Sequence, residues 1–163
     1  MRPQLMLPED FDAVRALSKS LGRNSRPELF GNNECQLVLK NATGQLVGWA
    51  RAAWWDPQDQ AVPCGYYLSG VEISRQYQRQ GFAAILSRAR LRWISERAKE
   101  AWCVVNARNE ASIALQLSLG FDQMFGAARI GNIEFTGGAG LLLRKDLSQH
   151  EIAGVEPNEE GKQ

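Results

Sequence analysis

The sequence predicts a mixed α/β fold in which helices pack on both faces of one sheet. Short strand-like runs alternate with three stretches of helical spacing, which begin near residues 8, 84 and 109. A strand leads through a short loop into the second helix, and a further strand joins the second helix to the third. The order of elements is therefore strand, helix, strands, helix, strand, helix and strands.

The N-terminal third contributes one helix and a long loop. A short strand over residues 4–7 precedes Pro8-Glu9-Asp10, a good helix start, and Phe11, Val14 and Leu17 then recur at helical spacing. Residues 22–33 are rich in Gly, Asn, Ser and Pro and predict a loop, with a helical turn around Glu28. This region should cover one face of the sheet.

Three strands are expected next. Residues 35–40 and 45–53 flank Asn41-Ala42-Thr43-Gly44, which is a hairpin signal. Residues 54–63 predict a second loop, and the fourth strand covers residues 66–73. Alternation along this strand puts Tyr67, Ser69 and Val71 on one side and Glu72 on the other, unless a bulge intervenes.

The segment Gln78-Arg79-Gln80-Gly81-Phe82-Ala83 joins the fourth strand to a helix over residues 84–99. The first N–H groups of a helix have no intrahelical partner and carry the positive end of the dipole, so they can hold a phosphate. Gly81 lacks a Cβ and allows close approach of a ligand. The helix is expected to bury Phe82, Ile85, Leu86, Ala89 and Trp93. A solvated face is expected for Arg88, Arg90, Arg92, Arg97 and Lys99.

The C-terminal part continues with a strand over residues 101–107 and a helix that Asn109 caps and Gly120 ends. Strand-like runs over 123–130 and 133–135 flank a Gly131-Asn132 turn, and residues 141–147 form the final strand. We expect a single domain over residues 1–147. The polar, acidic tail over residues 148–163 is expected to be disordered.

Composition excludes several classes of function. The formal net charge is +1, so no overall attraction to nucleic acid or to a membrane surface is expected. The three cysteines form no CxxC pair, which argues against a disulfide framework and against a zinc site. The one histidine, His150, lies in the acidic tail, which argues against a catalytic nucleophile activated by histidine. No apolar leader or membrane-spanning run is present, so we expect a cytoplasmic protein without a metal ion.

Two motifs together resemble the GNAT superfamily of acyl-CoA-dependent N-acetyltransferases. The CoA motif of that family matches Gln78, Gly81 and Ala83, and its later Asn-started helix matches Asn109 and Gly120-Phe121. The resemblance implies a mostly antiparallel, twisted sheet whose fourth strand diverges from the next strand, opening a central cleft for acetyl-CoA. The residues expected to hold acetyl-CoA are Val71, Ile73, Gln78, Arg79, Gln80, Gly81, Phe82, Ala83, Ala84, Asn109 and Ser112.

Acetyl transfer to an amine needs positioning, an oxyanion donor and a route for protons. The resemblance places the thioester beside the fourth strand, so the N–H of Val71 is the expected oxyanion donor. Base candidates are Glu72, Ser69, Tyr67 and Asp56, with Glu72 the nearest carboxylate and a water relay the alternative. Gln116 stands where many relatives carry a Tyr that protonates the thiolate, and a Gln can donate a hydrogen bond but cannot act as an acid.

The acceptor is expected to be the primary amine of a small molecule. A peptide N-terminus or lysine is the alternative, and an acyl-CoA-binding module without turnover is a rival of a different class. The aminoglycoside 6′-N-acetyltransferase branch is also similar and implies a cationic acceptor and an acidic pocket, but Ser69 replaces its Glu. A homodimer is possible. The expected acceptor contacts are Glu28, Phe30, Trp54, Trp55, Asp56, Tyr67 and Ser69.

Overall fold

The computed structural model describes residues 1–148. The predicted disordered tail, apart from Ser148, and His150 lie outside the described residues. The strands are β1 (Gln4–Leu5), β2 (Cys35–Lys40), β3 (Leu46–Trp55), β4 (Gly65–Ile73), β5 (Glu100–Asn106), β6 (Asp122–Ala127), β7 (Arg129–Ile130), β8 (Ile133–Glu134) and β9 (Gly140–Asp146). The helices are α1 (Phe11–Ser20), α2 (Phe82–Ser95) and α3 (Glu110–Ser118), with short 3-10 turns at Pro8–Asp10, Pro27–Leu29 and Arg75–Tyr77.

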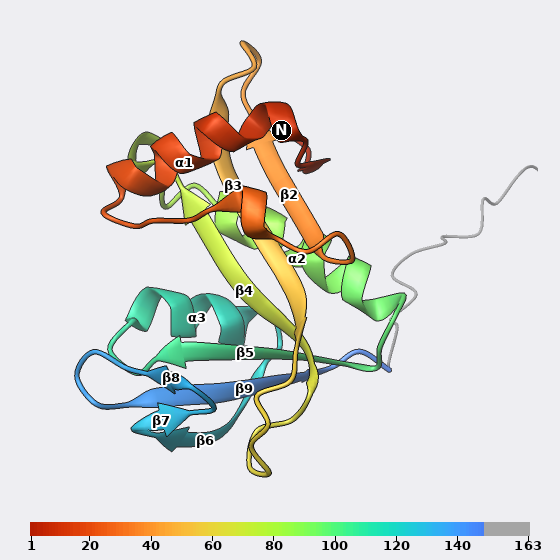
Figure 1. The fold of residues 1–163 in the computed structure, drawn as a ribbon, viewed down its shortest axis with the longest axis vertical. Helices are drawn as coiled ribbons and strands as arrows, with labels where there is room; N and C mark the ends of the chain where they lie inside the picture. Colours follow the sequence, from red (N-terminus) through yellow and green to blue (C-terminus); the bar gives the residue numbers. More distant parts are fainter. Residues whose placement is uncertain (149–163) are drawn as a thin grey trace, which may run out of the picture.

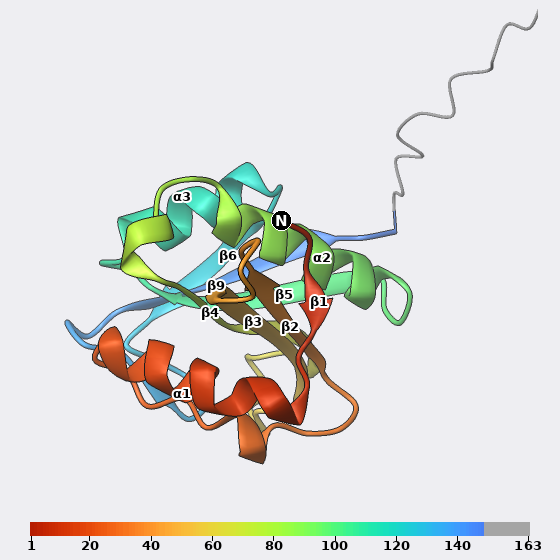
Figure 2. The ribbon, with the colours of Figure 1, turned by 90° about the horizontal axis from the view of Figure 1, so that it is seen from above.

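Seven strands form one sheet in the order β1-β2-β3-β4-β5-β9-β6, and β7 pairs with β8 in a separate hairpin. Every pairing in the large sheet is antiparallel except that of β4 with β5. Helix α1 covers one face, and α2 and α3 cover the other (Figures 1 and 2). The predicted mixed α/β fold, with a mostly antiparallel sheet and helices on both faces, is confirmed.

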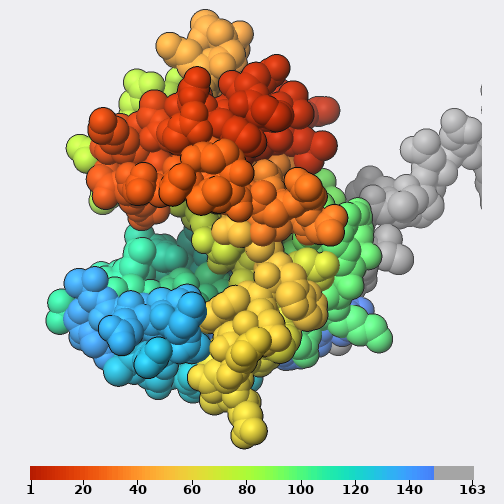
Figure 3. Space-filling model, viewed as in Figure 1, coloured from red at the N-terminus to blue at the C-terminus, as the bar shows by residue number. Residues whose placement is uncertain are grey.

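The sheet is nearly divided between β4 and β5. Their register contains one residue pair, Tyr67 opposite Trp102. On the other side of β4, the register with β3 shifts between Arg51 and Ala52, so that Ser69 has no partner and forms a bulge. Figure 3 shows the resulting hollow between the red and orange N-terminal part and the teal and blue C-terminal part. The cleft implied by the resemblance is therefore present.

The core is built on both faces of the sheet. Leu68, Val71 and Ile73 of β4 belong to the large cluster that α2 and α3 cover. Trp49 packs with Val14 and Leu17 of α1 on the opposite face. Tyr67 packs in a third cluster with Trp102 and Ile130.

Strand boundaries differ from the prediction near residue 54. Trp54 and Trp55, predicted to begin a loop, extend β3 because they pair with Tyr66 and Gly65 of β4. Aromatic side chains favour such paired positions, and Trp54 meets Tyr66 edge to face with ring centroids 5.2 Å apart.

Helix α2 ends at Ser95 rather than at Lys99, because the N–H groups of Arg97 and Ala98 both bond the carbonyl of Ile94 and close a terminal turn. Its buried stripe was predicted only in part. Leu86 is buried as expected, and Phe82, Ile85, Ala89 and Trp93 are half-buried against the core, but the other buried positions are Ser87, Arg90, Leu91 and Ile94. Arg90, expected on a solvated face, is 1% exposed. Hydrophobic spacing could not identify a stripe that contains a serine and an arginine.

Within residues 1–148, no helix has the length and apolar character needed to cross a bilayer.

Candidate functional site

A groove runs along the β4 side of the cleft and is made of two contiguous cavities. The first, of about 410 Å³, lies between β4, β5 and α3. The second, of about 650 Å³, lies beside the loop from β4 to α2. Both cavities are lined by Arg23, Val71, Ala83 and Ala111. We call this continuous space the donor groove.

The start of α2 forms one end of the donor groove. Gly81 is the N-cap with φ of +85°, and no side chain caps the helix. The first helical bond to this cap comes from the Ile85 N–H, so the N–H groups of residues 82–84 have no acceptor within the helix. Arg75 and Arg79 line the cavity here, and Arg79 itself has a positive φ of 60°. This end of the groove suits an anion such as a pyrophosphate.

Some predicted loop residues have structural hydrogen bonds. Gln78 donates from Nε2 to the carbonyl of Ile73, at 3.0 Å, and also lines the groove. Gln80 donates to the carbonyl of Gln76, at 3.0 Å. These bonds fix the loop that carries Gly81.

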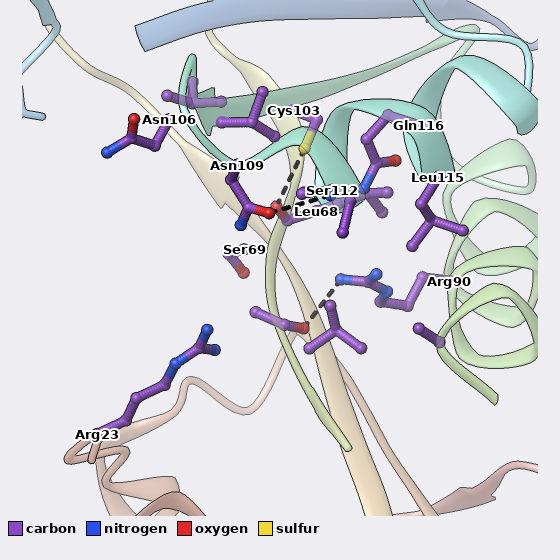
Figure 4. Close-up of a pocket in the computed structure, with 16 residues that line it drawn as sticks. Arg23, Leu68, Ser69, Arg90, Cys103, Asn106, Asn109, Ser112, Leu115 and Gln116 are labelled. Atoms are coloured by element: carbon purple, nitrogen blue, oxygen red, sulfur yellow. Dashed lines mark hydrogen bonds between the residues drawn. The ribbon is translucent and has the colours of Figure 1, made fainter. Parts of the chain in front are cut away.

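Helix α3 forms the opposite wall of the groove. The Asn109 side chain caps it by accepting from the Ser112 N–H at 3.1 Å, as predicted, and both residues line the first cavity. Gln116 lines the same cavity and is 3% exposed, and its Oε1 has no partner among the described residues. Figure 4 shows Asn109, Ser112 and Gln116 arranged along this wall.

The bulge at Ser69 changes which faces the β4 side chains occupy. Val71 packs in the cluster under α2 and α3, while Tyr67 belongs to the cluster on the opposite face. Simple alternation, which put these two residues on one side, therefore fails. Since β5 has diverged at this level, the backbone of Val71 lies at the open edge of β4 and lines the groove.

Glu72 lies on the α1 face of the sheet and is 4% exposed. Its Oε1 accepts from the hydroxyls of Ser18 at 3.1 Å and Ser25 at 3.0 Å, and its Oε2 accepts from Trp49 Nε1 at 2.8 Å. Arg23 Nη1 lies 3.8 Å from Oε1. The carboxylate thus ties the loop after α1 to the sheet beside the groove.

A separate cavity of about 280 Å³ lies against the bulge. Trp54, Trp55, Tyr67 and Ser69, all predicted acceptor contacts, line it together with Arg51, Val104, Asn132 and Ile133. It shares Leu68, Ser69 and Val104 with the donor groove, so the two spaces meet at the point where β4 leaves β5. We call it the acceptor cavity.

The other three predicted acceptor contacts do not line the acceptor cavity. Glu28 pairs with Arg15 at 2.9 Å. A hydrogen bond from its own backbone, and after it the bonds from Arg15 and Arg26, hold the pKa of Glu28 below its ordinary value. Phe30 packs on Trp49 and lies under the Arg51 guanidinium, 4.6 Å away. Asp56 accepts from the Gln58 N–H, at 2.9 Å, and that bond lowers its pKa.

The buried thiols are poor nucleophiles. Burial raises the pKa of Cys35 to about 11 and that of Cys103 to about 12, so both stay protonated at neutral pH. Burial also raises the pKa of Tyr67 above its ordinary value, and its hydroxyl donates to the carbonyl of Pro63 at 2.7 Å. Neither the two buried thiols nor the Tyr67 phenol is therefore ionised at neutral pH.

Sequence reasoning missed three arginines at the groove. Arg23 points into the cavity from the loop after α1 (Figure 4), and Arg75 lies two residues after the end of β4. Arg90 enters from α2. Only Arg75 had a sequence signal, because it lies next to the loop that carries Gly81.

The residues present fit an acyl-CoA. An uncapped helix start with arginines at one end of the groove suits the pyrophosphate, and the open edge of β4 suits an extended, amide-containing chain. Within residues 1–148, no three His, Cys, Asp or Glu side chains gather as metal ligands would.

Comparison with known proteins agrees with this geometry. The structure is similar to the ribosomal-protein-S18-alanine N-acetyltransferase from Escherichia coli, with a TM-score of 0.71 and 20% identity over 94% of this chain and 96% of that chain. It is also similar to a GNAT superfamily phosphinothricin acetyltransferase from Sinorhizobium meliloti in complex with AcCoA, with a TM-score of 0.70 and 14% identity over 96% of each chain. At these identities the likeness shows the fold. No curated protein sequence matches the chain.

The family model described as "Acetyltransferase (GNAT) family" matches residues 7–121, which include α1, the loop that carries Gly81, the cleft and α3. This match spans most of the chain and both motifs from which the resemblance was inferred, so the chain belongs to the GNAT family of acetyltransferases.

Proposed function

We propose that this chain is an N-acetyltransferase that moves an acetyl group from acetyl-CoA to a primary amine of a small molecule. The observation that carries the proposal is the meeting of the donor groove and the acceptor cavity at Leu68, Ser69 and Val104. Two molecules bound in these spaces would touch at the open edge of β4. Such proximity is the main requirement of a direct transfer.

The donor groove offers each part of acetyl-CoA a chemically suited partner. The N–H groups of residues 82–84, with Arg75 and Arg79, would hold the pyrophosphate, and the edge of β4 from Val71 to Ile73 would hold the pantetheine. Asn109 and Ser112 would border the thioester end. Acetyl-CoA supplies an activated thioester: the amine nitrogen bonds the carbonyl carbon, the carbon–sulfur bond breaks, and its electron pair goes to sulfur.

The chain itself then has three tasks. The Val71 N–H donates to the thioester oxygen, where negative charge develops. Gln116, in the same cavity, donates a hydrogen bond toward sulfur. The amine must arrive uncharged, with either Glu72 or a water relay taking its proton.

Features of the acceptor cavity favour a small molecule. Its volume of about 280 Å³ is at the low end for ligand sites, and Trp54 and Trp55 supply flat apolar walls. Its one charged lining residue is Arg51, which Glu34 neutralises through two bonds of 2.6 and 2.7 Å. An acidic pocket for a polycationic acceptor, as the aminoglycoside branch implies, is not what these residues form.

The deciding experiment is a thiol-release assay with acetyl-CoA and a panel of amines. The panel contains small neutral primary amines, amino acids, a polyamine, and a peptide with a free N-terminus and a lysine. We expect turnover with small primary amines and mass-spectrometric detection of the N-acetyl product. Preferential turnover of the peptide would favour the protein-acetylating alternative, and background rates for every amine with intact acetyl-CoA binding would favour the non-catalytic module.

Replacing Gly81 tests the pyrophosphate end of the groove. A β-branched residue at φ of +85° is strained, and its side chain would stand where the anion approaches. We expect Gly81→Val to weaken acetyl-CoA binding at least about tenfold, or about 1.4 kcal/mol, by calorimetry.

Gly44→Val is the matched control, because Gly44 has a φ of +83°, an equally open surrounding and a place in the β2–β3 hairpin. It should share the strain but keep the affinity. Equal affinity in both folded variants would remove the helix start from the binding site.

Position 116 tests how the thiolate leaves. If departure of sulfur limits the rate, Gln116→Tyr should raise kcat several-fold with little change in acetyl-CoA affinity, because a proton donor then acts only where charge develops. Gln116→Phe supplies the same ring without the hydroxyl and should not raise kcat. A rise in both variants would attribute the effect to packing instead.

Glu72→Gln distinguishes a base from an anchor. Loss of the carboxylate weakens the bonds from Ser18, Ser25 and Trp49, so we expect a loss of about 1–3 kcal/mol in stability by denaturant titration. If Glu72 is also the base, kcat falls about a hundredfold and the rise of kcat with pH on the acid side disappears. Ser25→Ala removes one bond to the carboxylate and leaves the charge, so it should keep that rise.

A further inference from the structure

Arg90 is a buried cation that has only neutral partners. Its Nη1 donates to the main-chain oxygens of Arg51 and Gly70, both at 2.9 Å, and its Nη2 donates to Ser87 Oγ at 2.8 Å. Its Nε has no partner among residues 1–148. The side chain is 1% exposed, and none of its acceptors is a carboxylate.

A buried charge is normally balanced by an opposite charge, because leaving water is unfavourable for an ion. Burial lowers the pKa of Arg90 to about 10, so the guanidinium is still charged at neutral pH. The positive charge therefore stays unbalanced within the described structure. Since Arg90 lines the donor groove, a ligand in that groove can supply the missing negative charge.

The hydrogen bonds of Arg90 connect it to the expected oxyanion donor. Gly70 O and Val71 N–H belong to one peptide group, and in a trans peptide these two atoms point in opposite directions. Because one nitrogen of Arg90 reaches both Arg51 O and Gly70 O, these carbonyls face the gap between β3 and β4 at the bulge. The Val71 N–H consequently faces the other way, toward the cleft. Figure 4 shows Arg90 extending from α2 toward the β4 backbone, where a dashed line marks one of its hydrogen bonds.

We propose that Arg90 is a positioning residue that supplies the positive charge against which negative charge develops in acyl transfer. Through the peptide group of Gly70 and Val71 it polarises the N–H that donates to the thioester oxygen. Through the cavity, which Gln116 also lines, it stabilises a sulfur anion. The inference rests on the proposed function, because both atoms belong to bound acetyl-CoA.

This role explains how the site can work with Gln116 in place of an acid. A proton donor neutralises the leaving sulfur by protonation, whereas a fixed cation stabilises it as the anion. A buried charge is effective here because it is screened less than a charge in water and is already oriented before the reaction.

The test measures equilibrium binding of CoA, whose free thiol reports on the charge near the sulfur position, and it needs no acceptor amine. Calorimetric affinities for CoA and for desulfo-CoA, which lacks the thiol, are compared between pH 6 and 9.5. An unbalanced cation lowers the pKa of the bound CoA thiol below the pKa of the same thiol in free CoA, so preference for CoA over desulfo-CoA should rise between the two pKa values. We expect a rise of at least about tenfold, which corresponds to one pKa unit.

Variants separate the charge from the hydrogen bonds. Arg90→Gln keeps a donor for the strand carbonyls but lacks the charge, and should make the preference independent of pH. Arg90→Lys keeps the charge and should retain the rise. Ser87→Ala removes one bond to the guanidinium and should also retain it. Thermal melting checks that each variant is folded.

A flat preference in the wild-type protein overturns the proposal whatever the variants do, and so does an undiminished rise in folded Arg90→Gln. If that variant does not fold, Arg90→Met takes its place, and the wild-type measurement still decides against the proposal when it is flat. Failure of the proposed function gives a different result. It would be seen as absent CoA binding or as background turnover with every amine, whereas failure of the Arg90 proposal is seen as intact CoA binding whose preference over desulfo-CoA does not change with pH.

Discussion

The interruption of the β3–β4 ladder at Ser69 is the constraint on which the rest of the site depends. Arg51 and Gly70 form the register pair that borders the bulge, and Arg90 donates to the carbonyls of both. By rotating the strand beyond Ser69, the bulge also places Val71 and Glu72 on faces that simple alternation would exchange. The groove edge, the anchor of the loop after α1 and the buried cation are thus three results of one extra residue.

The two faces of β4 divide the work of the site. On the face covered by α2 and α3, side chains form the donor groove, and on the α1 face Glu72 collects hydrogen bonds from Ser18, Ser25 and Trp49. The second set holds the loop from which Arg23 extends into the groove. Order in this loop therefore depends on a carboxylate of the α1 face that also lines the second cavity of the groove, which connects the stability of the N-terminal part with the shape of the groove.

Much of this architecture could be predicted, because turns and caps are local. Asn109 at the start of α3, Gly81 before α2 and the hairpin after β2 follow from residue chemistry within a few positions. The burial of Arg90 could not be predicted, because the two carbonyls that accept its hydrogen bonds belong to strands 20 and 39 residues away in the chain. Glu28 is likewise held outside the acceptor cavity by Arg15, a tertiary partner that single-sequence patterns do not contain, whereas Asp56 accepts a local bond from the Gln58 N–H.

The single residue pair between β4 and β5 makes the sheet behave as two smaller sheets joined near one end. The acceptor cavity takes Trp54 and Trp55 from one of them, and Val104 and Ile133 from the C-terminal half. Both halves therefore contribute walls to this cavity as well as to the donor groove. A molecule bound in the donor groove would contact β4 and β5 at once, and these two strands also supply Leu68 and Val104 of the acceptor cavity, so whatever occupies one space borders the other.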